Sequence, residues 1–305
     1  MSSTCLQLIQ QAAGEMGLSG PTSVIGNTAQ ETVQQLALLN ALGNELQRQY
    51  IWQHSTKSYR FNVDVLQTTG NTTNGSAVVT NIPSTAGLDS KFQVSGSGIN
   101  TNVGIVSVDS ATQVTLDQPC TATATGVALN FGQTKFVLPA DYDRPVNRTQ
   151  WDVTKHWEML GPVTAQQWEF LLSGWIATGP RVQFRLLGGY FQIWPIQTSE
   201  DLLGFEYISS YWVNSSGSFA PDKSSFTLDT DTCAFPDRLM VLGLKKKFYE
   251  AKGFDTTALS QDYEQQLGIA FGNDQGAGTL SMAPRLTSTL INWNNIPDSF
   301  YGTKQ

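Results

Sequence analysis

The sequence predicts an α+β protein in which helical segments near both ends of the chain flank a β-rich middle. Apolar residues recur at three- and four-residue steps in the first 50 residues and again over 236–271. They alternate with polar residues over 59–65, and short β-branched runs separated by turn residues fill 68–132. A chain of 305 residues is long enough for about two domains and a sizeable core.

The N-terminal segment predicts a helical hairpin that leads into a strand. The first helix is expected over 6–16. The second is expected to begin at a capping box formed by Thr28 and Glu31, and its apolar stripe continues to Tyr50. Over 59–65, aromatic residues and valines alternate with polar residues, which predicts a half-buried strand.

Residues 68–132 are predicted to form a domain inserted into a loop. This segment is rich in Thr, Ser, Asn and Gly, and Lys91 is its one basic residue. Five strand-like runs occur in it, at 77–82, 92–94, 103–108, 113–116 and 127–131. A spacing of roughly ten residues is typical of small β-sandwiches and barrels. The strand pattern resumes at 135–138, so the host core is expected to comprise 1–67 and 133–271.

The rest of the host core predicts mixed structure that ends in helices. The predicted elements, in order, are a helix over 161–172 that starts at Gly161-Pro162, a hairpin of 181–187 and 190–194 around Gly188-Gly189, a strand over 205–213, and helices over 236–252 and 257–271. Gly253 is expected to end the first of these last two helices. The final segment, 272–305, has no apolar period and is predicted to be an extended tail.

Composition argues against several classes of function. The chain carries 18 Lys and Arg against 25 Asp and Glu, a net charge of −7, which argues against a general nucleic-acid binder. No apolar run reaches the ~18 residues that a membrane helix needs, so a soluble, cytoplasmic protein is expected. Only 14% of residues are charged, against about 25% in ordinary domains. This depletion favours a subunit whose faces are covered by neighbours, and the alternative is a monomer rich in β-structure and turns.

No pattern in the sequence predicts catalysis, a cofactor or a metal site. Cys5, Cys120 and Cys233 stand far apart and form no C-x-x-C motif, which argues against zinc binding and against a disulfide scaffold. His54 and His156 lie beside tryptophans and are expected to be packed or surface imidazoles rather than ligands or bases.

Two D-x-D pairs and one basic run are the remaining candidates. Asp141 with Asp143, and Asp229 with Asp231, are expected to be turn residues that bond their own backbone. Calcium binding and a pair of carboxylates flanking a sugar are the alternatives. The run Lys245–Lys247 lies within a predicted helix and is expected to form a solvated rim; contact with acidic partner loops or with passing DNA is the alternative.

The order of these segments resembles the head-to-tail adaptor, or connector, proteins of tailed bacteriophages, most closely the podophage tail-tubular or gatekeeper-like adaptors. The segments that carry the resemblance are Val33–Gly43 leading into Tyr50–Trp52, the L-P-x-D-Y-x-R exit of Phe136–Arg144 with Asn147 and Trp151-Asp152, Phe205–Tyr207 with Trp212-Val213, Asp229–Asp231, Phe235–Gly243 and Gly253–Asp255. The resemblance covers most of 1–67 and 133–270, and implies a helical bundle with a β-sheet region. Residues 68–132 are similar to the immunoglobulin-like β-sandwich modules inserted in many phage structural proteins.

The resemblance implies a structural virion protein of the neck or tail, assembled in the host cytoplasm, with no enzymatic activity and no cofactor. It implies a ring, typically of twelve copies, beneath the portal and above the tail nozzle or tail tube, with DNA passing through its bore. Twelve copies at −7 each carry about −84, so the channel wall is expected to be acidic and to repel DNA in transit.

Contact with the portal is predicted for the C-terminal tail and for the basic run. The residues are Trp293, Ile296, Phe300, Lys245, Lys246 and Lys247. An aperiodic segment with spaced apolar side chains is suited to docking in grooves on another chain. A second hypothesis is a tail-fibre or receptor-binding protein in which 68–132 binds a glycan, and tail fibres are a further candidate partner of the adaptor.

Overall fold

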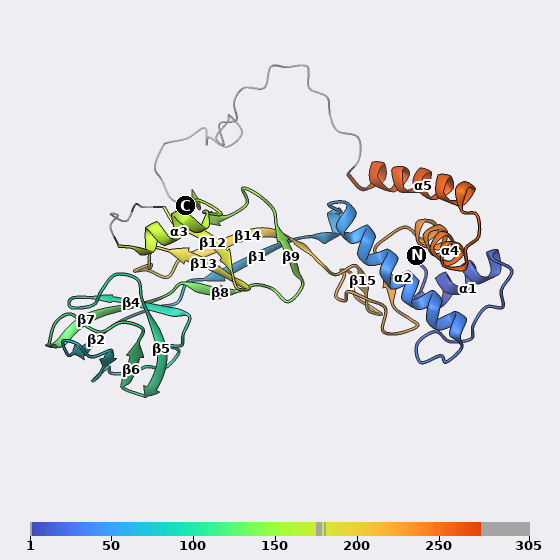
Figure 1. Ribbon diagram of the computed structural model, residues 1–305. Helices are drawn as coiled ribbons and strands as arrows, with labels where there is room; N and C mark the ends of the chain where they lie inside the picture. The colour runs from blue at the N-terminus through green and yellow to red at the C-terminus, as the bar shows by residue number, and fades with distance from the viewer. Residues whose placement is uncertain (1, 175–178, 180, 276–305) are drawn as a thin grey trace, which may run out of the picture.

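Two long strands connect the ends of an elongated molecule, β1 (Thr56–Asn62) and β14 (Leu202–Ser209) (Figure 1). They pair antiparallel over the whole length of β1, from Thr56 opposite Ile208 to Asn62 opposite Leu202. The structure, a computed structural model, describes residues 2–174, 179 and 181–275. Within these ranges it is mixed α+β with several sheets, which confirms the α+β class predicted from the sequence. The helical bundle implied by the resemblance stays a prediction.

Four helices form one end of the molecule: α1 (Cys5–Glu15), α2 (Gln30–Gln49), α4 (Asp237–Lys252) and α5 (Thr257–Gln275). The central helix is α4, which contacts each of the other three. Leucines of α2 and apolar residues of α4 form a common buried cluster with Trp212. Trp212 precedes β15 (Val213–Asn214), which pairs with β16 (Thr232–Cys233), and the 3₁₀ turn Gln53–Ser55 connects α2 to β1. The apolar periods of the sequence thus correspond to faces buried against α4.

Two helix starts differ from the prediction. At α2 no side chain caps the helix: Ala29 is the N-cap, and its N–H donates to Asn27 Oδ1 at 2.8 Å, so the expected capping box of Thr28 and Glu31 is wrong. A capping box does occur at α1, between Thr4 and Gln7. Helix α3 (Ala165–Leu172) begins after Pro162 rather than at it, because Thr164 and Gln167 form a second box there.

The C-terminal ends of the helices lie closer to their predicted positions than the helix starts do. Gly253 ends α4 in the left-handed conformation, with φ of +77°, as its position in the sequence predicts. Helix α5 continues to Gln275, four residues beyond its expected end at Phe271, so the start of the predicted tail is helical. The other residues of that tail, including Trp293, Ile296 and Phe300, lie outside the described residues.

Two sheets form the middle of the molecule. One contains β1, β14, β10 (Trp151–Asp152) and β11 (Trp157–Glu158), with β9 (Tyr142–Pro145) also paired to β14. The other has the order β12 (Gln183–Leu187), β13 (Tyr190–Trp194), β8 (Lys135–Val137). Their facing sides share an aromatic core, in which the rings of Phe191 and Phe205 stack at 5.0 Å.

One predicted hairpin and one predicted strand in these sheets can be compared with the structure. Gly188 and Gly189 have φ of +61° and +79°, which confirms the two-residue hairpin. The expected single strand over 205–213 is wrong, because β14 ends at Ser209 and β15 begins at Val213.

The other end of the molecule is a six-stranded β-structure with its own apolar cluster. Its strands are β2 (Val65–Thr72), β3 (Val78–Val79), β4 (Phe92–Gly96), β5 (Val103–Ser110), β6 (Gln113–Leu116) and β7 (Ala124–Gln133). The pairing order is β2-β7-β4-β5-β6-β3, and a bridge between Asn71 and Thr80 pairs β3 back to β2. The sheet therefore closes on itself. The domain division at 68–132 and its immunoglobulin-like topology stay predictions.

Asn102 fixes this β-structure to the middle sheets. It has φ of +59°, its Nδ2 donates to the carbonyl of Leu172 at 2.8 Å, and its Oδ1 accepts from Trp194 Nε1 at 3.1 Å. Asn130 adds a second contact, donating to the carbonyl of Gln197 at 3.0 Å. Within the described ranges, no helix combines the length and the apolar character needed to cross a bilayer.

Candidate interaction site

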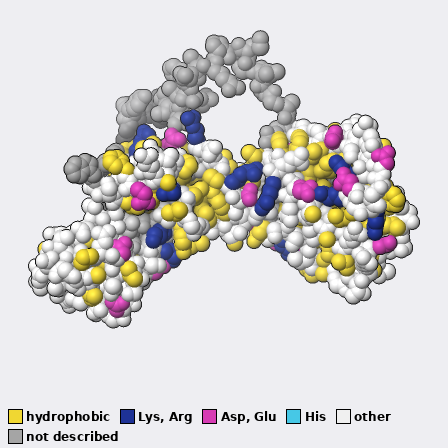
Figure 2. Space-filling view, in the orientation of Figure 1, with side chains coloured by type: hydrophobic (Ala, Val, Ile, Leu, Met, Phe, Trp, Pro, Cys, Tyr) yellow, Lys and Arg dark blue, Asp and Glu magenta, His cyan; other side chains and the backbone are white. Residues whose placement is uncertain are grey.

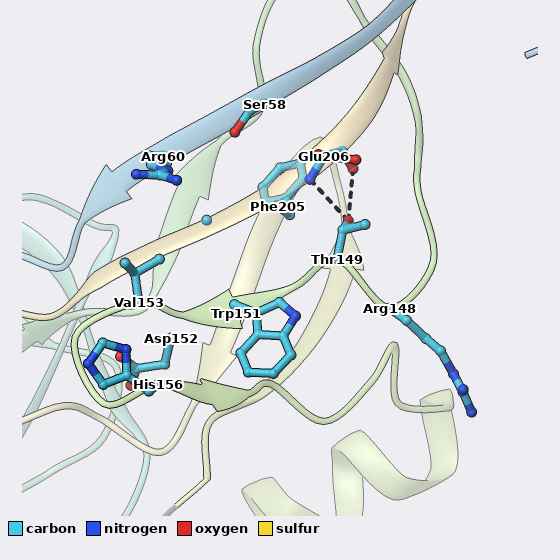
Figure 3. Close-up of a pocket in the computed structure, with 11 residues that line it drawn as sticks. Ser58, Arg60, Arg148, Thr149, Trp151, Asp152, Val153, His156, Phe205 and Glu206 are labelled. Atoms are coloured by element: carbon cyan, nitrogen blue, oxygen red, sulfur yellow. Dashed lines mark hydrogen bonds between the residues drawn. The ribbon is translucent and has the colours of Figure 1, made fainter. Parts of the chain in front are cut away.

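An open groove lies along the outer face of β14 (Figure 3). Its volume is about 460 Å³. Gly204 stands at its centre, paired with Arg60 of β1 on one side and with Trp151 of β10 on the other. A Cβ at Gly204 would lie 3.1 Å from Arg60 Cγ, so a side chain here would press on Arg60 and narrow the hollow.

The groove combines flat aromatic surface with charge of both signs. Arg60 and Glu206 are exposed, and Trp151 is half-buried beside them. Thr149 holds one wall in place, because its Oγ accepts from the N–H of Glu206 at 3.0 Å. Figure 3 shows Arg148 directed away from the groove. A shallow, open surface of this kind is suited to holding a segment of another polypeptide, with Arg60 available to a carboxylate.

Exposed hydrophobic side chains also occur elsewhere on the middle of the molecule. Five of the large ones belong to the middle sheets, to α3 or to the turns between them: Val137, Trp157, Leu160, Phe170 and Leu187. Figure 2 shows hydrophobic side chains over the middle of the molecule, whereas the β2–β7 end is mainly white, with few charged side chains. In this view, hydrophobic side chains are therefore more frequent over the middle and the helical end than over the β2–β7 end.

The four acids of the D-x-D pairs contact other groups of their own chain. Asp141 accepts from Lys57 Nζ at 2.7 Å, from the Tyr207 hydroxyl at 2.8 Å and from the Ser209 hydroxyl at 2.7 Å. Asp143 lies 3.6 Å from the guanidinium of Arg144. The expectation that these acids bond their own turns is wrong for Asp141, which joins three segments distant in sequence.

In the second pair, one acid bonds its own turn, as expected, and the other does not. Asp231 does bond its own turn, accepting from the N–H groups of Thr227 and Leu228 at 2.9 Å each, and it also pairs with Lys223 at 2.8 Å. Asp229 accepts from the N–H groups of Val24 and Ile25, more than 200 residues away. In the described part of the chain, no three His, Cys, Asp or Glu side chains gather as a metal site.

The lysines of the basic run contact other parts of their own chain. Lys245 pairs with Glu15 at 2.9 Å and Lys247 with Glu45 at 2.7 Å. The Lys246 ammonium lies 5.2 Å from the centre of the Tyr263 ring. Only 13% of the Lys245 side chain and 21% of the Lys247 side chain are exposed, so the run is not the solvated rim expected from the sequence. Its contact with a partner stays a prediction.

His54 is packed among aromatic rings, as the sequence predicts. Its ring centre lies 5.3 Å from that of Phe235 and 6.0 Å from that of Trp52, and Nε2 is 3.3 Å from Gln47 Oε1. Burial lowers the pKa of His54 to about 4, although Asp274 acts in the opposite direction. His156, by contrast, is exposed at the edge of the groove.

The depressed pKa makes stability depend on pH. An unfolded histidine has a pKa near 6.5, so below that value the unfolded chain binds a proton that the folded chain does not. The free energy of unfolding should therefore fall from pH 6.5 downward, by about 1 kcal/mol at pH 5.5. Urea denaturation of the protein and of His54→Gln at pH 7 and 5.5 measures this loss. The variant should lack this part of the pH dependence, and an equal loss in both proteins would contradict the burial of the imidazole.

One exposed feature is not anticipated by any motif in the sequence. Phe219, in the loop that follows β15, is fully exposed to solvent. Gly217, with φ of +88°, and Pro221 mark this loop as a turn region, but turn residues alone do not indicate that an aromatic side chain projects from it.

The described residues thus combine an open groove, exposed apolar side chains and ion pairs within the chain. Residues 108–287, more than half of the chain, match the sequence model of the SU10 adaptor protein family. The chain therefore belongs to the SU10 adaptor protein family, and is a structural phage protein of adaptor type. Membership makes it a component of the virion that interacts with other head or tail proteins. No curated protein sequence matches the chain.

Proposed function

We propose that the protein forms a ring of twelve copies that joins the portal to the tail nozzle or tail tube and lets DNA pass through its bore. The match to the adaptor family over 108–287 is the observation that carries this proposal. In this role the chain acts by forming interfaces and catalyses no reaction.

The two-ended architecture supports a connecting role. The helical end and the middle sheets have separate apolar cores, so each can present its own contact surface. The continuous antiparallel pairing of β1 and β14 joins these two parts. A mechanical force that pulls the parts from each other is then shared among several backbone hydrogen bonds. The Lys57–Asp141 ion pair adds a side-chain connection between β1 and the segment that precedes β9.

The charge content supports assembly into a larger structure. Charged residues are 14% of the chain, and the cores of protein interfaces are depleted of charge because desolvating it is costly. Several of the charges that do occur are paired within the chain, including Lys155 with Asp201 at 2.6 Å and Lys245 with Glu15. With a net charge of −7 per copy, the proposed channel repels DNA rather than binding it.

Electron microscopy of the purified protein, alone and mixed with the portal of the same phage, tests this proposal. We expect rings that dock on the portal and lengthen it, with the portal alone as the control, and the images give the copy number directly. If the protein stays off the portal or forms trimers, the adaptor role is wrong. A receptor-binding or fibre role would then be tested by glycan binding.

The same mixture tests the C-terminal tail as the portal contact. A chain that ends at Gln275 keeps all of α5 and removes 276–305, which contain Trp293, Ile296 and Phe300. We expect this chain to lose portal binding while its thermal transition stays in place. Portal binding at the level of the full chain would show that the contact lies elsewhere.

A further inference from the structure

One side of β1 has no strand partner. β1 pairs with β14 over all seven of its residues and without a bulge, whereas β14 also pairs with β10 and β9. In the described part of the chain, no other strand and no isolated bridge meets β1. Proteins usually protect such an edge with free charges, proline, a bulge or a covering segment. β1 has no proline and no bulge, and Lys57 is engaged by Asp141, so its free edge lacks most of these protections.

The backbone groups on this free edge belong to three exposed residues of β1. On β14, Leu202 and Glu206 form their hydrogen bonds on the side opposite β1. The residues paired with them, Asn62 and Ser58, therefore direct their own N–H and C=O groups away from β14, and Arg60 between them does the same. None of these groups has a hydrogen-bond partner among the described residues. A strand from elsewhere could bind all of them.

The two faces of the sheet differ along this edge. Tyr59 and Phe61 are half-buried at the margin of the aromatic core. Ser58 and Arg60, which alternate with them, line the groove on the opposite face. A strand added here would place one row of its side chains beside the aromatic rings and the other row beside the groove.

The C-terminal end of α5 lies beside the start of β1. The N–H of Gln53, three residues before β1 begins, donates to Asp274 Oδ2 at 3.0 Å. The rings of Phe271 and Tyr50 stack with their centres 4.4 Å apart. Figure 1 shows this end of α5 on the side of the helical end that is nearest the middle sheets. The chain therefore leaves α5, at Gln275, close to the strand that has the free edge.

The sequence beyond α5 contains a segment suited to forming a strand. Residues 285–296 lie between Pro284 and Pro297 and contain neither glycine nor proline. The tail has no apolar period, but in this segment β-branched and aromatic residues occupy four alternate positions: Thr287, Thr289, Ile291 and Trp293. The nine residues before the segment, 276–284, can span about 30 Å, and a seven-residue strand is about 23 Å long. The segment can thus reach any part of β1.

We propose that residues 285–296 pair, as a further strand, with the free edge of β1 in the same chain. The short connection from α5 keeps the segment near β1, which gives it a higher effective concentration there than a segment of a separate molecule in dilute solution. The row with Ile291 and Trp293 lies beside Tyr59 and Phe61, and the other row extends the wall of the groove. Because Trp293 belongs to the segment, the predicted portal contact requires the segment to leave β1.

Amide hydrogen exchange, resolved to single residues, tests the pairing. We expect the N–H groups of Ser58, Arg60 and Asn62 to exchange more slowly in the full chain than in a chain that ends at Gln275, by about tenfold or more. The N–H groups of the residues between them face β14, so their exchange should be the same in both chains and serves as the internal control. Equal exchange of the three edge amides in the two chains overturns the inference.

Prolines in the tail test which segment forms the strand. Leu290→Pro combined with Ile291→Pro removes a donor on whichever side of the segment faces β1, and changes no residue of the described fold. This double variant should lose the protection of the edge amides. Thr279→Pro with Leu280→Pro is the matched control, because it lies outside 285–296 and should keep the protection. The same result from both double variants would contradict the assignment to 285–296.

Dilution distinguishes pairing within one chain from pairing between copies. Protection that comes from the same chain should stay constant over about a hundredfold dilution, because its effective concentration is set by the connection from α5. Protection that weakens on dilution would assign the added strand to a second copy and would overturn the inference.

These outcomes are distinguishable from those that test the proposed function. Protected edge amides in a protein that never docks on the portal would leave the inference standing and reject the adaptor ring. Docking by a full chain whose edge amides exchange as fast as those of the shortened chain would leave the adaptor role standing and reject the inference.

Discussion

Replacing Gly43 by alanine is expected to lower the free energy of unfolding by about 3 kcal/mol, the upper part of the range for overpacked cores. Gly43 lies within α2, and a Cβ added there would stand 2.2 Å from two ring atoms of Trp212. That ring cannot move aside easily. It is fully buried, packs against Phe226 and Phe235, and donates from Nε1 to Asn44 Oδ1 at 3.0 Å.

Gly14 offers a matched control for the same substitution. It lies within α1, and a Cβ built on it meets nothing within 4 Å. Alanine is favoured over glycine in a helix by roughly 0.5–1 kcal/mol, so Gly14→Ala should stabilise the protein by about that amount. Urea denaturation followed by circular dichroism measures both variants. Equal effects of the two substitutions would contradict the close packing of Trp212 on α2.

Elements with a strong local signal could be predicted from the sequence alone. The apolar face of α4 and its end at Gly253, the hairpin at Gly188-Gly189 and the alternating burial of β1 all depend on residues close together in the chain. The residue at which a helix starts is harder to predict. Thr28 and Glu31 have the composition of a capping box, but they do not form one in the structure. Several nearby polar side chains could cap the first turn, and composition alone does not say which of them does so.

Features that join distant segments could not be predicted. Asp141 binds Lys57, 84 residues earlier, and Ser209, 68 residues later, whereas its neighbour Tyr142 suggests only a local turn. Closure of the six-stranded sheet depends on one bridge between Asn71 and Thr80. A weak signal did exist for the groove on β14, since a glycine within a strand pattern often marks a close approach, and Gly204 is such a glycine.

Replacing Asp141 by asparagine is expected to destabilise the protein by about 3 kcal/mol. Breaking one side of a buried ion pair costs about 3–5 kcal/mol, and the low end applies here because the Lys57 side chain is 28% exposed. The amide also cannot accept all three of the hydrogen bonds from Lys57, Tyr207 and Ser209. Chemical denaturation at pH 7 measures the loss.

The same carboxylate contributes to unfolding by acid. Burial tends to raise the pKa of Asp141, but hydrogen bonds from Lys57, Ser209 and Tyr207 outweigh it and hold the pKa below its ordinary value. A lowered pKa means that the stabilisation is present above pH 4 and is lost as the pH falls through the folded-state value. Asp141→Asn should therefore lose less stability than the parent between pH 4 and pH 2. Asp143→Asn is the control, because its contact with Arg144 at 3.6 Å is partly exposed and should contribute less than about 0.5 kcal/mol. If the two variants were equally stable at pH 7, Asp141 would not be the residue that connects β1 to β14.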